Sequence, residues 1–131
     1  MHRVAVLADG APARASAAAV AEAVVQLEQY FAGERRAFDV RLAPLTSPRG
    51  PAMRAAIASV GYGRTSTYGE LAAAIGSSAR AIGQACRTNA YPILVPCHRV
   101  LVAQGPDNYS AGSGLPTKQW LLAHERRHGS D

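Results

Sequence analysis

Apolar residues in the first third of the chain recur at the spacing of a helix. Within an alanine-rich stretch they stand three or four positions apart, at Val20, Val24, Leu27 and Phe31. This spacing predicts a helix over residues 15–31, with Ser16 as its N-cap and Gly33 as its end. Residues 38–42 then alternate between apolar and polar, which predicts a short strand. The prolines and the glycine of residues 44–51 indicate a linker or a domain boundary.

The middle of the chain has the pattern of three helices. They are predicted over residues 52–60, 68–75 and 79–88. Thr67 can cap the second of them, with Glu70 at the capping-box position. The tight turn expected at residues 76–78 makes the second and third helices a helix-turn-helix pair. Many nucleic-acid-binding proteins use such a pair, and other helix pairs pack in the same way.

The last third is expected to be more irregular. Its predicted elements are an apolar connector over 91–95, a short strand over 100–102, a glycine-rich loop over 105–116 and a helix over 117–126. Trp120, Leu121 and Leu122 are expected to form the buried face of that helix. The whole pattern predicts an α/β or mostly α fold, with a reduced N-terminal α/β segment at residues 1–46 and a C-terminal domain at residues 47–131.

Charge and composition narrow the class of protein. The 131 residues include 14 Lys and Arg against 9 Asp and Glu, and this net charge of +5 is compatible with binding to nucleic acid. No apolar run approaches the roughly 20 residues of a membrane-spanning helix, and the N-terminus lacks the apolar stretch of a secretory signal. We therefore expect a cytoplasmic protein that does not bind a membrane. Cys86 and Cys97 are expected to be free thiols, and the absence of metal-ligand spacing predicts neither a metal nor a cofactor.

The segment Pro96–Val100 carries the clearest candidate chemistry. A thiol is a good nucleophile only as the thiolate, and because its ordinary pKa is about 8.5 it needs a base nearby. His98 follows Cys97 and can take the proton, directly or through a water, while Glu125 is a candidate to orient the imidazole. Spacing alone does not bring the three residues together, and a buried structural cysteine is the alternative interpretation.

Several blocks of the sequence resemble one family in the same order. Residues Val95–Val100 resemble the active-site motif of the O6-alkylguanine-DNA alkyltransferases. The other blocks resemble the family's helix-turn-helix, hinge, binding loop and closing helix, and they are Ser66–Ala72, Ala79–Gly83, Asn89–Pro92, Asn108–Ser110 and Lys118–Glu125. The resemblance implies a winged-helix-like C-terminal domain that repairs DNA by moving the O6-alkyl group of guanine onto a cysteine, once per molecule.

The resemblance also implies a role for each matching residue. Cys97 would be the nucleophile, His98 the base through a water, Glu125 the orienting carboxylate and Asn89 the cap of the hinge. The alkylguanine pocket would be formed by Val95, Tyr109, Ser110 and Lys118, with Tyr109 donating a hydrogen bond to the guanine ring. DNA binding and base flipping would involve Tyr68, Arg80, Ala81, Gly83 and Arg99. Arg80 would fill the gap in the stack, and Tyr68 would crowd the phosphate of the flipped nucleotide.

The expected partner is double-stranded DNA that contains O6-alkylguanine, bound by a monomer. Three other functions stay open at the level of the sequence. The first is an alkyltransferase-like protein that recognises the lesion without transferring anything. The second is a small helix-turn-helix regulator with a sensor cysteine, and the third is a Cys-His hydrolase, which would turn over repeatedly.

Overall fold

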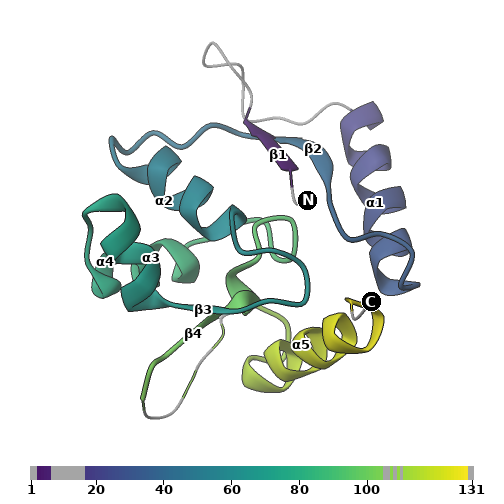
Figure 1. The fold of residues 1–131 in the computed structure, drawn as a ribbon. Coiled ribbons are helices and arrows are strands. Elements are labelled where there is room, and N and C mark those ends of the chain that lie inside the picture. The colour runs from purple at the N-terminus through teal and green to yellow at the C-terminus, as the bar shows by residue number, and fades with distance from the viewer. Residues whose placement is uncertain (1–2, 7–16, 105–106, 108, 110, 130–131) are drawn as a thin grey trace.

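The structure of the protein is a computed structural model, which describes residues 3–6, 17–104, 107, 109 and 111–129. Its elements along the chain are β1 (Arg3–Val6), α1 (Ala17–Phe31), β2 (Asp39–Leu42), α2 (Gly50–Ala58), β3 (Ser66–Thr67), α3 (Tyr68–Ile75), α4 (Ala79–Arg87), the 3-10 helix η1 (Cys97–Arg99), β4 (Val100–Leu101) and α5 (Leu115–Gly129). Figure 1 shows α2, α3 and α4 grouped on one side of the molecule and α1 on the other. Ser16 and Ser110 lie outside the described residues.

The N-terminal segment forms a small parallel β-α-β unit. β1 pairs with β2 in the register from Arg3 opposite Asp39 to Val6 opposite Leu42. Parallel neighbours need a long crossover between them, and α1 lies within that crossover. Gln26 of α1 joins the helix to β2, because its side chain accepts from Asp39 N at 2.9 Å and donates to Asp39 O at 3.1 Å. The helix and the second strand were predicted, whereas β1 was not.

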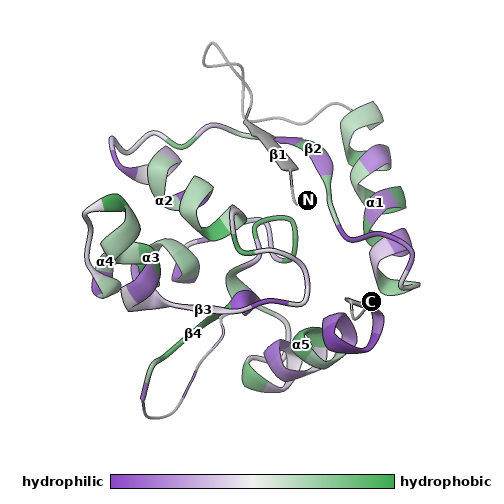
Figure 2. Ribbon diagram, viewed as in Figure 1, coloured by the Kyte–Doolittle hydropathy of each residue, from purple (hydrophilic) through white to green (hydrophobic). Residues whose placement is uncertain are grey.

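The buried face of α1 is polar in part, and most of its apolar stripe is exposed, although Leu27 packs partly buried against the core. Gln26 and Tyr30 are the buried residues of this helix, whereas Val20, Val24 and Phe31 are each about half exposed. Figure 2 shows hydrophobic bands alternating with hydrophilic ones along α1. The apolar period therefore marked the helix correctly without marking the face that packs.

The face of α5 that packs inward also differs from the prediction. Lys118, Leu121, His124 and Glu125 are its buried residues. These positions follow one another at helical spacing, and Trp120 lies beside this face rather than on it, so it stays 49 % exposed. The expected burial of Trp120 is therefore wrong. Its indole stacks on His124, with ring centroids 4.9 Å apart and an angle of 10° between the planes.

The helix-turn-helix pair forms where the local signals place it. The side chain of Thr67 accepts from Glu70 N, and the Glu70 side chain accepts from Thr67 N, so both halves of the capping box are present. Gly76 ends α3 in the left-handed conformation, at φ 66°, which glycine adopts without steric cost. Ser78 then caps α4 by accepting from Ala81 N at 3.1 Å. The predicted ranges of both helices are confirmed, with α4 ending one residue early.

A second parallel pairing connects the start of α3 to the Cys97 segment. Ser66 lies opposite Val100, and Thr67 lies opposite Leu101. Because Tyr68 follows Thr67 directly and η1 precedes Val100, this pairing brings Tyr68 close to Cys97. One cluster of buried residues includes members from both sides of the linker, among them Tyr30, Phe38, Leu42, Ile57, Leu71, Ile82, Val95, Val100 and Leu121. The fold is mostly helical with short strands, as predicted.

Candidate active site

Two tight turns position Cys97. Ile93 has φ 74°, a conformation that a β-branched residue rarely adopts, within a turn closed by Leu94 N donating to Pro92 O at 2.8 Å. Pro96 then has φ −82° and ψ 62°, which with the Cys97 N to Val95 O bond of 2.8 Å is the geometry of an inverse γ-turn. The proline ring restricts φ to this value, so the local backbone alone fixes the position of Cys97, independently of its side-chain contacts.

Asn89 ties the end of α4 to this segment. Its side-chain amide donates to Val95 O at 3.1 Å and to Cys97 Sγ at 3.4 Å, and its Oδ1 accepts from Tyr91 N at 2.9 Å. One residue therefore holds the helix end, the turn and the sulfur in a fixed relation. The hinge role of Asn89 stays a prediction, and the structure adds a direct contact between its amide and the thiol.

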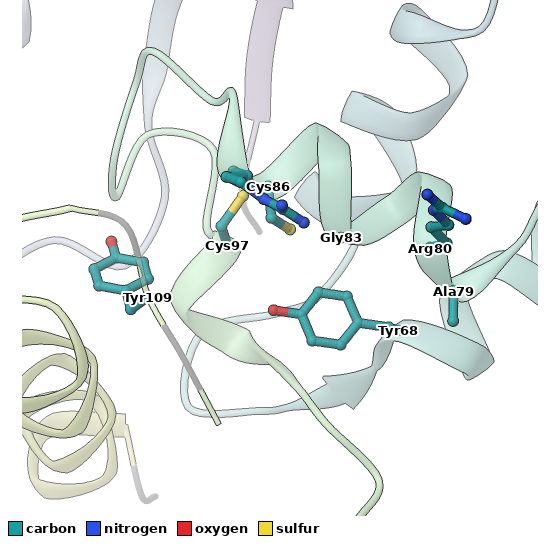
Figure 3. Close-up of a pocket in the computed structure, with 8 residues that line it drawn as sticks. Tyr68, Ala79, Arg80, Gly83, Cys86, Cys97 and Tyr109 are labelled. Carbon is teal, nitrogen blue, oxygen red and sulfur yellow. The ribbon is translucent and has the colours of Figure 1, made fainter. Parts of the chain in front are cut away.

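Cys97 lines a cavity of about 570 Å³ that opens beside the helix-turn-helix pair. The described residues that line it come from α3, α4, η1 and the segment before α5, and they are Tyr68, Ala79, Arg80, Gly83, Cys86, Arg87, Cys97 and Tyr109. Figure 3 shows Cys97, Cys86, Tyr68 and Tyr109 around this space, with Arg80 further along α4. Arg80 and Arg87 are exposed, so two cations stand at the cavity. This volume is within the range of small-molecule sites.

The two thiols of the protein share the cavity and interact. Both are buried and free. The pKa of Cys97 is raised by its hydrogen bond with Cys86 and by burial, and the amide of Asn89 opposes this rise. The pKa of Cys86 is lowered, chiefly by the same hydrogen bond with Cys97. The two sulfurs therefore share one negative charge at most, because a second thiolate beside the first would be strongly repelled.

A buried imidazole–carboxylate–guanidinium group lies next to Cys97. His98 Nε2 lies 2.6 Å from Glu125 Oε2, and Arg99 donates to Glu125 through Nε at 2.8 Å and Nη2 at 2.9 Å. All three side chains are at most 1 % exposed. Burial alone would raise the pKa of Glu125, but the hydrogen bonds from His98 and Arg99 outweigh it and hold that pKa well below its usual range. Glu125 is therefore ionised.

The protonation of His98 follows from this geometry. Burial lowers the pKa of His98, although Glu125 acts in the opposite direction. A neutral imidazole next to a carboxylate carries its proton on the nitrogen that faces the carboxylate, so Nε2 is the donor to Glu125. The other nitrogen, Nδ1, is buried and has no hydrogen-bond partner among the described residues. The imidazole therefore keeps one lone pair available for a proton.

Two tyrosines of the cavity are neutral hydrogen-bond donors. Burial raises the pKa of both Tyr68 and Tyr109 to about 12. Within the part of the chain that the structure describes, the hydroxyl of Tyr109 is buried and has no partner. A ligand in the cavity could therefore receive a hydrogen bond from it.

The structure corrects the expected role of Arg99. Its side chain is fully buried, donating to Glu125 and also to Val60 O at 2.8 Å. A fully buried guanidinium cannot reach a phosphate on the surface, so Arg99 does not belong to a DNA-binding set. It is instead the counter-charge of the buried Glu125 carboxylate.

Three further residues predicted for the pocket or for DNA binding are not among the described residues that line the Cys97 cavity. Lys118 is buried and donates to Val100 O at 2.7 Å and to Asp107 at 2.8 Å, so it supports the chain near Tyr109. Ala81 and Val95 line a second cavity of about 610 Å³, against a different face of α4. The carbonyl of Val95 already accepts from Asn89 and Cys97, which leaves it poorly placed to receive a ligand amine.

Sequence reasoning missed two residues of the site. Cys86 was considered only as a thiol unlike Cys97, yet it lines the same cavity. Tyr30 donates its hydroxyl to Glu125 Oε2 at 2.7 Å from a helix 95 positions earlier. Position 86 lies three residues before Asn89, on the helix already expected to approach the site, so a helical-face argument could have found it. Nothing in the sequence pointed to Tyr30.

Neither a membrane-spanning helix nor a metal site is found among the described residues. No helix there combines the length and the apolar character that crossing a membrane requires. No group of three or more His, Cys, Asp or Glu side chains there is arranged to hold a metal ion.

The fold and the site define a helix-turn-helix protein with a buried thiol beside an imidazole–carboxylate pair. The family model described as 6-O-methylguanine DNA methyltransferase, DNA binding domain, matches residues 52–127. The chain belongs to this family.

Named relatives and solved structures agree with this assignment. The methylated-DNA–protein-cysteine methyltransferase of Methanosarcina acetivorans is 46 % identical over 106 residues, covering 79 % of this chain and 67 % of that protein. The one from Mycolicibacterium paratuberculosis is 46 % identical over 112 residues, covering 84 % and 67 %. The crystal structure of Mycobacterium tuberculosis O6-methylguanine methyltransferase is 38 % identical with a TM-score of 0.72, covering 82 % of this chain and 66 % of that one.

The structure of Mycobacterium tuberculosis OGT in complex with DNA is similar to the same degree, with 39 % identity and a TM-score of 0.72, over 82 % of this chain and 68 % of that one. The chain thus spans about two thirds of the length of the relatives it matches.

Proposed function

We propose that this protein repairs double-stranded DNA by transferring the alkyl group of O6-alkylguanine to Cys97 Sγ. The observation that carries the proposal is the cavity itself. Cys97 lines it together with residues of the helix-turn-helix pair, and the next residue, His98, is paired with Glu125 in the core. The family, and the names of its relatives, support the same reaction. We further propose that the protein acts as a monomer.

The proton of the thiol has one evident destination. His98 Nδ1 takes it, directly or through one water, while Nε2–H stays on Glu125. The sulfur then attacks the alkyl carbon, so that an S–C bond forms as the C–O6 bond breaks. The electron pair of the broken bond stays on guanine, and the Tyr109 hydroxyl donates to the ring as the charge develops. The thioether on Cys97 is stable, so each molecule acts once.

The alkylated base must leave the duplex before this chemistry can occur. Unpairing and unstacking cost a few kcal/mol. Arg80 is exposed on α4 and lines the cavity, which suits a side chain that fills the gap left in the stack. Gly83, one turn further along α4, has nothing within 4 Å of the place where a Cβ would stand, which leaves room for close approach of the DNA backbone.

The test measures the mass of the intact protein after incubation with a duplex that contains one O6-methylguanine. We expect one added methyl group, located on the Cys97 peptide, and none with an undamaged duplex of the same sequence. Cys97→Ala should gain nothing, whereas the matched variant Cys86→Ala should still gain one. A methyl group on Cys86, or none on the wild type, contradicts the proposal. Tight binding of the alkylated duplex without a mass change would support lesion recognition alone.

A further inference from the structure

Tyr30 reaches the catalytic centre from the N-terminal segment. Its side chain is fully buried, and its hydroxyl donates to Glu125 Oε2 at 2.7 Å. The ring is fixed by its neighbours, with centroids 5.7 Å from Phe38, 6.0 Å from Tyr62 and 5.2 Å from His124. The backbone is held too, because Tyr30 O lies 2.8 Å from His124 Nε2. These contacts fix the position of the Tyr30 hydroxyl.

The Tyr30 hydroxyl and the His98 imidazole bind the same oxygen of Glu125. Glu125 Oε2 receives Tyr30 Oη at 2.7 Å, His98 Nε2 at 2.6 Å and Arg99 Nη2 at 2.9 Å. The other oxygen, Oε1, receives Arg99 Nε at 2.8 Å and Gly63 N at 3.1 Å. Both carboxylate oxygens therefore accept hydrogen bonds from several donors. Tyr30 and His98 donate to the same oxygen, so each weakens the bond that the other makes.

We propose that Tyr30 is a positioning residue for alkyl transfer, whose hydroxyl shares Glu125 Oε2 with His98 and so holds the carboxylate in line with the imidazole. This inference rests on the proposed function, and it extends the reaction's machinery to α1. Tyr30 is not among the described residues that line the cavity of Cys97, so its effect is transmitted through Glu125.

Removing the hydroxyl has a predictable effect on His98. Without Tyr30 Oη, the charge on Oε2 is less dispersed, and it attracts the imidazolium more strongly. The charged and titratable groups that face His98 are Glu125 and Lys118 on α5 and Arg99 in η1. Those that face the Tyr30 hydroxyl are Glu125, Arg99 and Tyr62. None of these groups is altered by Tyr30→Phe, so the pKa of His98 should rise.

The expected signature is a displaced pH profile. His98 must be neutral to accept the thiol proton, so the acid limb of the transfer rate should move to higher pH in Tyr30→Phe. A displacement on the order of one pH unit would give about a tenfold loss of rate on that limb, with a smaller loss above it. A residue that merely stabilised the fold would change protein stability without moving the limb.

The chain offers a matched control in Tyr62→Phe. Tyr62 packs edge-on against Tyr30, and its hydroxyl is buried without a hydrogen-bond partner among the described residues. Both variants lose one buried hydroxyl from the same aromatic cluster, but only Tyr30→Phe removes a bond to Glu125. Single-turnover transfer is measured for both variants and the wild type from about pH 4.5 to about pH 9, a range that includes an acid limb lying below the ordinary pKa of histidine. The substrates are a duplex with O6-methylguanine and free O6-benzylguanine.

We expect the acid limb of Tyr30→Phe to be displaced equally on the two substrates, while Tyr62→Phe follows the wild type. An undisplaced limb in Tyr30→Phe overturns the inference, as does an equal displacement in Tyr62→Phe. A second readout does not need the reaction. The imidazole of His98 is titrated by NMR, with its signals assigned by comparison with His98→Gln, and its pKa should be higher in Tyr30→Phe. If the wild type transfers no alkyl group, the proposed function fails, and this titration still decides the role of Tyr30.

Discussion

Replacing Glu125 by glutamine tests how much the buried network stabilises the protein. The substitution keeps the size of the side chain and removes its charge. Arg99, fully buried, would then face a neutral amide with a single acceptor oxygen, in addition to Val60 O, which accepts from Nη1. The new amide group also places N–H bonds where His98, Tyr30 or Arg99 now donate, so at least one donor loses its acceptor.

The expected cost of Glu125→Gln is large compared with the stability of a small domain. Leaving a buried charge without its partner costs about 3–5 kcal/mol. The free energy of unfolding of such a domain is about 5–15 kcal/mol. With a denaturant dependence of about 2 kcal/mol per molar urea, the unfolding midpoint should fall by about 2 M. The measurement is urea unfolding followed by circular dichroism at pH 7.5.

Glu70→Gln is the matched control for Glu125→Gln. Glu70 is exposed and belongs to a capping box that glutamine can also complete, so its midpoint should shift by less than about 0.5 M. Adding Arg99→Met to Glu125→Gln removes the unpaired charge and should recover part of the loss. A cost below about 1 kcal/mol for Glu125→Gln, or no recovery in the double variant, would show that the buried charges are not coupled as argued.

Three further outcomes follow from the site. Cys86→Ala should change the pH dependence of Cys97 alkylation by iodoacetamide, because the two buried thiols are coupled and share one negative charge at most; an unchanged profile would refute the coupling. Arg80→Ala should slow transfer from a duplex on the order of a hundredfold while sparing free O6-benzylguanine, which needs no flipping, and equal losses on the two substrates would argue against the gap-filling role. The free energy of unfolding should fall as pH drops below about 6.5, because the folded state lowers the pKa of His98 and the unfolded chain takes up the proton first. It should fall again below about pH 4.3, because the lowered pKa of Glu125 makes the unfolded chain bind that proton first. A urea midpoint that stays constant from about pH 7 to about pH 3 would contradict both shifts.

The elements that the sequence predicts well are those fixed by local chemistry. The helix at residues 68–75 was placed correctly because Thr67, Glu70 and Gly76 determine both of its ends through their own backbone and side-chain bonds. β1 was missed because a four-residue strand has little pattern of its own, and its partner β2 lies across a helix. Elements that exist only through a distant partner leave a weak signal in the sequence.

The residues of the site also differ in how far the sequence predicts them. The sequence places Cys97 beside His98, and α4 ends close enough before them for Asn89 to reach both the turn and the sulfur. Which way a side chain faces in the folded core is a different question. Arg99 turns inward to Glu125 because an ionised carboxylate buried between helices needs a counter-charge, and no spacing in the sequence shows where that carboxylate lies. Tyr30 depends on the rotation of α1, whose apolar stripe pointed to the wrong face.

The high pKa of Cys97 fits a thiol that is consumed by a single use. A thiolate at this position would react with any electrophile that entered the cavity, and each such reaction would remove one molecule from repair. Burial raises the pKa of Cys97 and keeps the sulfur as a thiol. His98 is neutral and held by Glu125, and its Nδ1 has no hydrogen-bond partner among the described residues. The thiolate then has to form within the bound complex, as the alkyl carbon reaches the sulfur. This arrangement lowers reactivity toward free electrophiles and favours an alkyl group that is presented on a flipped base. A variant with a lower Cys97 pKa should therefore react faster with iodoacetamide, without a matching increase in the rate of transfer from duplex DNA.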